Sequence, residues 1–314
     1  MKIPQLAAIR RALSLWINSS QPKDNGDSHT DKDAIDWVRI IPFIVLHMVA
    51  ITGAVLTGFS WAAFIALALS YFVRMFAITG FYHRYFSHRT FKAHRLVQFG
   101  FAVLGLTATQ RGPLWWAAHH RHHHRHADTH NDPHAPLHGF WWSHAGWFLS
   151  RRHYQADYDQ IRDFAQYPEL CWLDRHELLI PVLYATSFFL LGWGLEIWWP
   201  ELNTGAWQML CWGYFLSTVV LIHATLTINS LAHRWGRRRY ETRDDSRNNW
   251  CLALLTLGEG WHNNHHHYPG SVRQGFYWWE VDVTYYLLRA MNAVGLIYDL
   301  KAVPPALLNA RRVH

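Results

Sequence analysis

Four long apolar stretches constrain what this chain of 314 residues can fold into. They cover residues 41–59, 61–80, 179–198 and 207–228. Each comes close to the roughly 20 apolar residues that a helix needs to cross a lipid bilayer. The sequence therefore predicts an all-α integral membrane protein with four transmembrane helices, folded as a single domain over residues 1–314.

Basic residues are distributed unevenly around these stretches. The turn around Ser60 and the loop at 199–206 contain no Lys or Arg, whereas the segments on the other side of the bundle hold nearly all of them. By the positive-inside rule, both termini face the cytoplasm. We therefore expect residues 83–176 and 233–314 to form a cytoplasmic helical cap, and residues 1–36 to be a mobile N-terminal arm.

A shorter apolar segment at 96–109 could be read as a fifth crossing. A fifth crossing at 96–109 would place the basic segments before it and after it on opposite sides of the membrane. The segment is also short for a bilayer span. We therefore predict that it forms a helix lying at the membrane interface.

Histidine is frequent, with 24 in the chain, and eight of these residues form three clusters between or after the apolar stretches. The clusters are His83 with His88, His120 with His123 and His124, and His262 with His265 and His266. The last two have the i, i+3, i+4 spacing that places three side chains on one helical face. His83 and His88 are five apart, so the helix that carries His83 should end or widen before His88. Because imidazole is a common neutral metal ligand, the clusters predict a site for two metal ions.

Ten of the histidines outside these clusters are expected to have other roles. His122 and His267 point roughly 160° and 140° away from the first ligand of their clusters and are read as bystanders. His47 and His223, in apolar stretches, are expected to be hydrogen-bonded bundle residues. Solvation or hydrogen bonding to ligands is expected for the loop residues His126, His130, His134, His138, His144 and His153. The alternative for the clusters is promiscuous zinc binding of the kind seen in purification tags.

Six segments around these clusters resemble the membrane fatty acyl desaturases, specifically the stearoyl-CoA (Δ9) desaturase-like branch. They are HRYFSHRTF at 83–91, HHRHHH at 119–124, DPH at 132–134, GFWWSHAGW at 139–147, NSLAHRWG at 229–236 and GEGWHNNHH at 258–266. The segments occur in family order from about residue 40 to residue 270. The resemblance implies a mushroom-shaped protein with four spans, a cytoplasmic cap, a dimetal centre bound by nine histidines, and a bent tunnel for the acyl chain.

Carried over by position, the resemblance implies nine ligands and one residue that acts through a water molecule. The ligands are His83, His88, His120, His123, His124, His233, His262, His265 and His266. Asn229 approaches the second metal site through water, and its i, i+4 relation to His233 puts both on one helical face. The nearest carboxylates are Asp128, Asp132 and Glu259. They are expected to orient imidazoles by accepting the distal N–H, with loop salt bridges as the alternative.

The implied reaction explains why a redox metal is needed. Removing two hydrogens from an unactivated methylene pair demands an oxidant that no side chain supplies. Zinc has no accessible redox couple, whereas iron does. The resemblance thus implies two Fe ions that cycle between Fe2+ and Fe3+, with O2 as the co-substrate.

Electrons must come from a separate protein. The chain contains neither a GxGxxG nucleotide loop nor an HPGG haem-domain signature. The expected donor is cytochrome b5, ferredoxin or rubredoxin. Arg237, Arg238 and Arg239 form a candidate docking face, with membrane anchoring as the alternative. The net charge of +7 fits contact with anionic membrane lipids or an acidic partner, and no motif indicates nucleic-acid binding.

Recognition of the substrate head group stays open. Arg151 and Arg152 match a basic pair that meets phosphates in the family, whereas Ala118 and His119 replace an Arg-Asp pair that helps hold coenzyme A in its animal members. Basic residues at a membrane face also suit phospholipids. The substrate is therefore a fatty acyl-CoA or an acyl-lipid. Arg74, inside the second stretch, should face the bundle or a polar end of the tunnel, either in an ion pair or in a functional role.

Two other function classes compete with desaturation. One is a histidine-box di-iron hydroxylase or alkane monooxygenase, which would release an alcohol. The other is a metal transporter, which would be expected to place its ligands near the bilayer midplane rather than beyond the ends of the spans. The short termini favour a bacterial inner membrane over the endoplasmic reticulum, with the active site on the cytoplasmic side.

Overall fold

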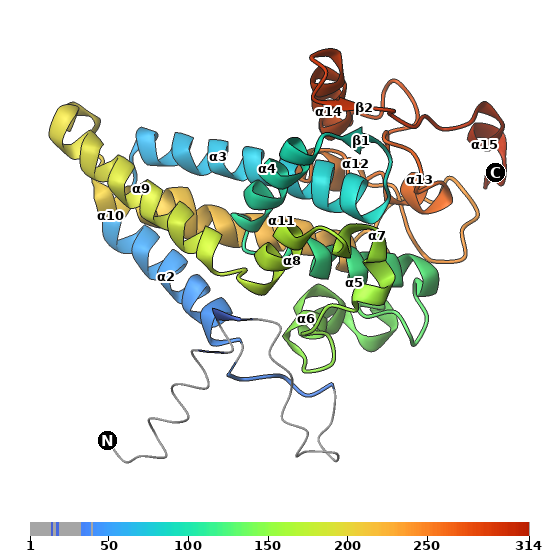
Figure 1. The fold of residues 1–314 in the computed structure, drawn as a ribbon, viewed down its shortest axis with the longest axis horizontal. Helices are drawn as coiled ribbons and strands as arrows, with labels where there is room; N and C mark the ends of the chain where they lie inside the picture. The colour runs from blue at the N-terminus through green and yellow to red at the C-terminus, as the bar shows by residue number, and fades with distance from the viewer. Residues whose placement is uncertain (1–13, 15–16, 19–32, 39, 314) are drawn as a thin grey trace.

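The computed structural model describes residues 14, 17–18, 33–38 and 40–313, and its regular structure is almost entirely helical (Figure 1). A short antiparallel pair, β1 (Lys92–Ala93) and β2 (Ile297–Tyr298), joins the segment after the first histidine cluster to the C-terminal region. The predicted all-helical class therefore holds apart from this pair. Most of the predicted arm, residues 1–36, lies outside the described residues.

Among the described residues, three helices are long and apolar enough to cross a membrane. The first is Trp61–Ser87, formed by α3 (Trp61–Phe76) and η1 (Ala77–Ser87), and the second is α9 (Leu179–Trp198). The third is Ala206–Ser230, formed by α10 (Ala206–Met209), η6 (Leu210–Leu216) and α11 (Ser217–Ser230). The first predicted span corresponds to α2 (Ile41–Thr57), whose 17 residues extend about 26 Å at 1.5 Å per residue. Figure 1 shows α2, α3, α9 and α11 running side by side at one end of the molecule.

Two short turns are joined by hydrogen bonds at the end of the bundle that lies away from the histidine clusters. Gly58, at φ +68°, ends α2, and the Ser60 hydroxyl accepts a hydrogen bond from the Ala63 amide to begin α3. In the other turn, Thr204 donates to the Ser60 hydroxyl across 2.6 Å. Gln208 donates to the carbonyl oxygens of Thr57 and Gly58. These bonds satisfy polar groups that lipid could not and hold the two helical hairpins together.

Arg74 is completely buried within the bundle, as the sequence predicted for a cation in an apolar span. Its guanidinium donates to the hydroxyls of Ser217 and Thr218 and to the carbonyl oxygens of Ser70 and Thr107. The alternative of an ion pair is therefore wrong, because all of these acceptors are neutral. Through these four hydrogen bonds Arg74 cross-links α3, α11 and the segment that follows α4 (Arg95–Leu106).

The helix that carries His83 widens before it reaches His88, as its spacing predicted. Residues Ala77–Ser87 form a π-helix, and the His88 amide donates to the His83 carbonyl oxygen five residues earlier at 3.2 Å. Because a π-turn brings residues i and i+5 onto the same side, the two imidazole rings lie 4.9 Å apart. This local widening allows His83 and His88, which are five residues apart, to face the same site.

The head region, residues 88–178 and 231–313, consists of short helices at the other end of the bundle (Figure 1). The predicted interfacial helix is α4 (Arg95–Leu106), whose 12 residues span only about 18 Å. The other described elements of the head region are α5 (Pro113–His126), η2 (Pro136–His138), η3 (Trp142–Gly146), α6 (Trp147–Leu149), η4 (Tyr158–Ile161), α7 (Arg162–Ala165), α8 (Pro168–Arg175), α12 (Trp250–Leu255), α13 (His262–His267), α14 (Val283–Ala293) and α15 (Pro305–Asn309). The short 3-10 helix η5 (Pro200–Leu202) lies in the turn between α9 and α10.

Candidate metal centre

Helix α5 presents the second histidine cluster because its start is fixed on α8. Pro113 opens the helix, where its missing N–H is not needed. One carboxylate oxygen of Asp174 then accepts from the amides of Leu114 and Trp115 at 3.0 and 2.9 Å. The carboxylate thus caps the positive end of the helix dipole. The three histidines follow within the next turns on one face.

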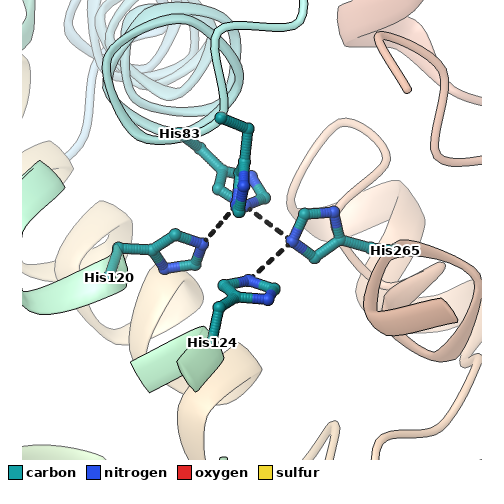
Figure 2. Close-up of side chains that lie close together, drawn as sticks. His83, His120, His124 and His265 are labelled. Atoms are coloured by element: carbon teal, nitrogen blue, oxygen red, sulfur yellow. Dashed lines mark hydrogen bonds between the residues drawn. The ribbon is translucent and has the colours of Figure 1, made fainter. Parts of the chain in front are cut away.

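Nine imidazoles gather into two groups at the junction of the bundle and the head region. The first group is His83, His88, His120, His124 and His265, and the second is His123, His233, His262 and His266. Within each group the candidate ligand nitrogens all lie within 4.8 Å of one another. Figure 2 shows four rings of the first group turned toward a common point from η1, α5 and α13. These are the same nine histidines that the sequence singled out.

The spacing of the ring nitrogens fits metal ligation. Nε2–Nε2 distances are 3.1 Å for His83–His265, 2.9 Å for His88–His120 and for His124–His265, and 3.0 Å for His233–His262. Two nitrogens bound to one ion at about 2.1 Å and at right angles would be about 3.0 Å apart. The donor set therefore suits one metal ion in each group.

Carboxylates behind the rings indicate which nitrogen is left for a metal. Asp132 lies 3.0 Å from His123 Nδ1, Asp128 lies 2.9 Å from His233 Nδ1, and Glu259 pairs with His83 Nδ1. All three carboxylates singled out in the sequence thus face an imidazole. An N–H donated from Nδ1 to a carboxylate leaves the lone pair of Nε2 free to point into the group.

Asp244 is a fourth such carboxylate, and the sequence analysis missed it. Its Oδ2 lies 2.9 Å from Nδ1 of His266. The Nε2 atoms of His266 and His123 then face each other at 3.4 Å, with both Nδ1 protons committed to carboxylates. Two such lone pairs repel unless a cation lies between them. Asp244 sits 22 residues before His266, and no spacing rule connects them.

Replacing Asp244 by Asn should weaken metal binding to the second group by about 10–100-fold, because the neutral amide has only one accepting oxygen, whereas the two carboxylate oxygens accept from His266 Nδ1 and from the Ser246 amide. The matched control is Asp245→Asn, since the Asp245 carboxylate is exposed and pairs with Arg238 at the surface. The measurement is metal retained per chain during dialysis against graded chelator. Equal retention by the two variants would contradict the orienting role of Asp244.

Burial keeps the rings neutral, which is the form that binds metals. It lowers the pKa values of His88, His120, His124, His262 and His265 well below the ordinary value, and nearby imidazoles lower them further. Burial alone would raise the pKa values of Asp132 and Asp244. However, the imidazoles beside each carboxylate outweigh this effect and hold both pKa values below the usual range. These five rings therefore present neutral nitrogen donors, whereas the effect of burial on His123 is outweighed by Asp132, which raises the pKa of that ring.

A buried ion cluster supports the first group from behind. Arg84 donates to Glu259 and to Asp282, and its side chain is 1% exposed. Gln274 donates to the other oxygen of Glu259 at 2.9 Å. Glu259 in turn contacts His83. Arg84 therefore neutralises the carboxylate that orients a candidate ligand.

The other predicted site residues lie as follows. His122 contacts the Asn131 carbonyl oxygen, His267 contacts that of Leu307, and neither belongs to a nitrogen group. Asn229 lies on α11, four residues before His233, and lines a cavity beside the centre. A bridging water between Asn229 and a metal stays a prediction.

An apolar cavity of about 340 Å³ reaches the metal centre from within the bundle. Its wall includes Phe43 and Leu46 of α2, Phe148 of α6, and Ile222 and Leu226 of α11. His120 of the first group and Asn229 also line it. A hydrocarbon chain in this cavity would therefore lie against the candidate metal ligands.

A second, polar cavity of about 720 Å³ adjoins the first at His119, which lines both. Five further histidines line the polar cavity, namely His122, His126, His130, His138 and His153. Arg152 also lines it and pairs with Asp33 at 3.1 Å. Arg151 is next to it in the chain, but its contact with a substrate head group stays a prediction.

The predicted basic docking face is less positive than the sequence suggested. Arg238 pairs with Asp245 at 3.4 Å, and Arg239 pairs with the buried carboxylate of Glu280 while lying over the Tyr277 ring. Two of the three charges in Arg237–Arg239 are therefore already balanced within the chain. A donor would meet mainly Arg237 among these three residues.

Comparisons with known proteins agree with the motifs. The family model for fatty acid desaturase matches residues 59–298. The chain is 35% identical over 278 residues to an sn-2 palmitoyl-lipid 9-desaturase of Nostoc sp. (strain 36), covering 86% of this chain and 91% of the relative. It is 35% identical over 272 residues to an sn-1 stearoyl-lipid 9-desaturase of Anabaena variabilis, with 86% and 95% covered. It is 34% identical over 304 residues to an acyl-CoA 5-desaturase of Anemone leveillei, with 92% and 91% covered.

Proposed function

The chain belongs to the fatty acid desaturase family, and from this premise we propose that it is a membrane-bound, O2-dependent desaturase that introduces a cis double bond at the Δ9 position of a saturated acyl chain. Relatives that desaturate position 9 and relatives that desaturate position 5 are similarly close, so Δ9 is the finer part of the proposal. The observation that carries it is the apolar cavity that meets His120 and Asn229 beside nine converging imidazoles.

The proposed reaction converts a CH2–CH2 pair, O2, two electrons and two protons into a CH=CH pair and two water molecules. Two iron ions held by the nine histidines, with Asn229 acting through water, would supply the oxidant by activating O2. The protein itself must hold one CH2–CH2 pair of the acyl group against the centre and exclude water. Trp115, Trp116 and Trp147 line the cavity near His120 and are suited to both tasks.

The acyl carrier is proposed to be coenzyme A or a glycerolipid, with its head group in the polar cavity beside Arg152. Relatives of both kinds are similarly close, because the matches include lipid desaturases and acyl-CoA desaturases. An anionic head group would displace Asp33 from Arg152 and would find Arg151 next to it. The electron donor is proposed to be an external cytochrome b5, ferredoxin or rubredoxin.

Replacing both Arg151 and Arg152 by Ala should raise the KM for acyl-CoA by about tenfold, the equivalent of 1.4 kcal/mol, while sparing metal content. The loss should be smaller for a zwitterionic glycerolipid, which carries less charge than coenzyme A. Steady-state kinetics on both carriers, with metal analysis of the same samples, make the measurement. An unchanged KM for acyl-CoA would count against the assignment of this pair.

Four transmembrane helices, with α2 as the first, are also part of the proposal, as are a bacterial inner membrane and a cytoplasmic location for the head region. Three long apolar helices support a membrane location, and the basic residues support the orientation. The domain assignment, one unit over residues 1–314, stays a prediction with its proposed segment boundaries.

Expression in a host that lacks its own desaturase tests the proposed activity. We expect new monounsaturated chains in the lipids, with the double bond located by mass spectrometry after chemical derivatisation. A hydroxylated chain in place of an alkene would instead support the di-iron hydroxylase, and metal flux into proteoliposomes without O2 consumption would support a transporter.

A further inference from the structure

Three histidines away from the metal centre form one continuous hydrogen-bonded chain that links the bundle to the head region. His47 of α2 contacts His223 of α11 through their Nε2 atoms at 2.9 Å. The Nδ1 atom of His223 lies 3.0 Å from Nε2 of His144 in η3. Nδ1 of His144 lies 2.9 Å from the Ser230 hydroxyl, and His47 Nδ1 lies 2.7 Å from the Phe43 carbonyl oxygen. Every ring nitrogen of the three histidines thus has a partner.

The groups at the two ends of this hydrogen-bonded chain decide which nitrogen donates and which accepts in each contact. The Phe43 carbonyl oxygen can only accept, so His47 donates from Nδ1 and accepts at Nε2. His223 must then donate from Nε2 and accept at Nδ1, and His144 must donate from Nε2. The Ser230 hydroxyl completes the chain by rotating from the Leu226 carbonyl oxygen toward His144 Nδ1. Three neutral rings and one hydroxyl therefore satisfy all the ring nitrogens without a net charge.

This hydrogen-bonded chain joins α2 and α11, whose residues line the apolar cavity, to η3, which leads directly into the lining helix α6. His47 follows the lining residue Leu46, His223 follows the lining residue Ile222, and His144 precedes the lining residue Trp147 by three positions. Hydrocarbon supplies no alternative partner for an imidazole, so these contacts have few competitors within a bilayer. The position of α2 relative to α11 is thus set by specific bonds at the level of the cavity.

We propose that His47, His223 and His144 act as positioning residues. They set the width of the acyl cavity and so select the lengths of acyl chain that fit it. The selection rests on the desaturase activity proposed above. The hydrogen-bonded chain does not rest on that activity, because its contacts are those of the fold itself. Neither the metal ligands nor the carboxylates behind them take part in it.

The direct test compares His47→Phe with His47→Gln and Met48→Phe. Phe removes both contacts at similar volume, whereas the Gln amide oxygen can still accept from His223. Met48 is 58% exposed on the same helix and gives a matched control for adding an aromatic ring. The readout is kcat and KM for myristoyl, palmitoyl and stearoyl chains on a carrier that supports the parent enzyme, with metal content measured in parallel.

For His47→Phe we expect the ratio of kcat/KM between the best and the shortest chain to change by about three- to tenfold, mostly through KM, at unchanged metal content. His47→Gln should restore the parent ratio, and Met48→Phe should retain it. An unchanged ratio in His47→Phe, or the same change in Met48→Phe or His47→Gln, would overturn the proposal.

A second readout separates this inference from the proposed activity. Cys211 of η6 is buried, and a Cβ atom at Gly53 of α2 would lie only 2.4 Å from its Sγ, so α2 covers this thiol closely. If the contacts of His47 hold α2 in place, alkylation of Cys211 in the folded protein, followed by mass spectrometry of the peptide, should be faster in His47→Phe than in Met48→Phe. Equal rates would overturn the positioning role of His47 even if the protein desaturates lipids. A faster rate without any alkene product would keep the positioning role and reject the proposed activity.

Discussion

Replacing His266 by Ala is expected to abolish desaturation and to release metal from the second group. Its Nε2 faces His123 in a group of four nitrogens, so one donor of four is removed together with the ring that Asp244 orients. His124→Ala should have the same effect on the first group, where five nitrogens converge. Activity should fall to the background of cells carrying an empty vector.

Neighbouring histidines provide the controls for this prediction. His122→Ala should leave metal content intact, because His122 contacts a loop carbonyl oxygen and belongs to neither group. His267→Ala should do likewise, although the ring stacks on Tyr240 and its loss should lower thermal stability. The measurement is metal per chain and alkene formed per chain for all four variants. Loss of metal in His122→Ala equal to that in His124→Ala would show that the helical faces have been assigned wrongly.

Replacing Arg84 by Met should destabilise the protein by about 3–5 kcal/mol, because two carboxylates would be left buried without a cation. Asp282 is fully buried and Glu259 nearly so, and both accept from the Arg84 guanidinium. Their ionised forms could persist only at a large desolvation cost, so they would become protonated or the region would open. His83 should then lose its fixed acceptor, and metal should leave the first group.

Arg89→Met is the matched control for the same loss of charge five residues later. The Arg89 side chain is 61% exposed and pairs with Asp163 at 3.3 Å, so its loss should cost about 1 kcal/mol or less. Thermal unfolding in detergent, scanned at two rates to detect irreversibility, measures both effects. Similar melting temperatures for the two variants would contradict the supporting role assigned to Arg84.

Much of the site could be predicted because local spacing carries the relevant geometry. The i, i+3, i+4 pattern on α5 and α13 depends only on helical periodicity, and the five-residue gap between His83 and His88 required a wider turn, which η1 supplies. His233 was reached by resemblance, because a lone histidine has no spacing of its own.

What could not be predicted depends on tertiary contacts between distant segments. Asp244 and the Arg84–Asp282 pair meet their partners 22 and 198 residues away along the chain. The hydroxyl partners of Arg74 lie on α11, 143 and 144 residues later, so an ion pair was a reasonable alternative from the sequence. His47 and His223 were expected to be hydrogen-bonded bundle residues, but their continuation to His144 required the packing of η3.

The claim that the nine imidazoles hold two iron ions is tested most directly by the metal content of purified protein that forms an alkene in the same preparation. Elemental analysis should find two iron ions per chain, with iron content and activity falling together as chelator removes the metal. Active protein that contains no iron, or whose activity is unaffected by complete removal of iron, would contradict the assignment of the nine imidazoles.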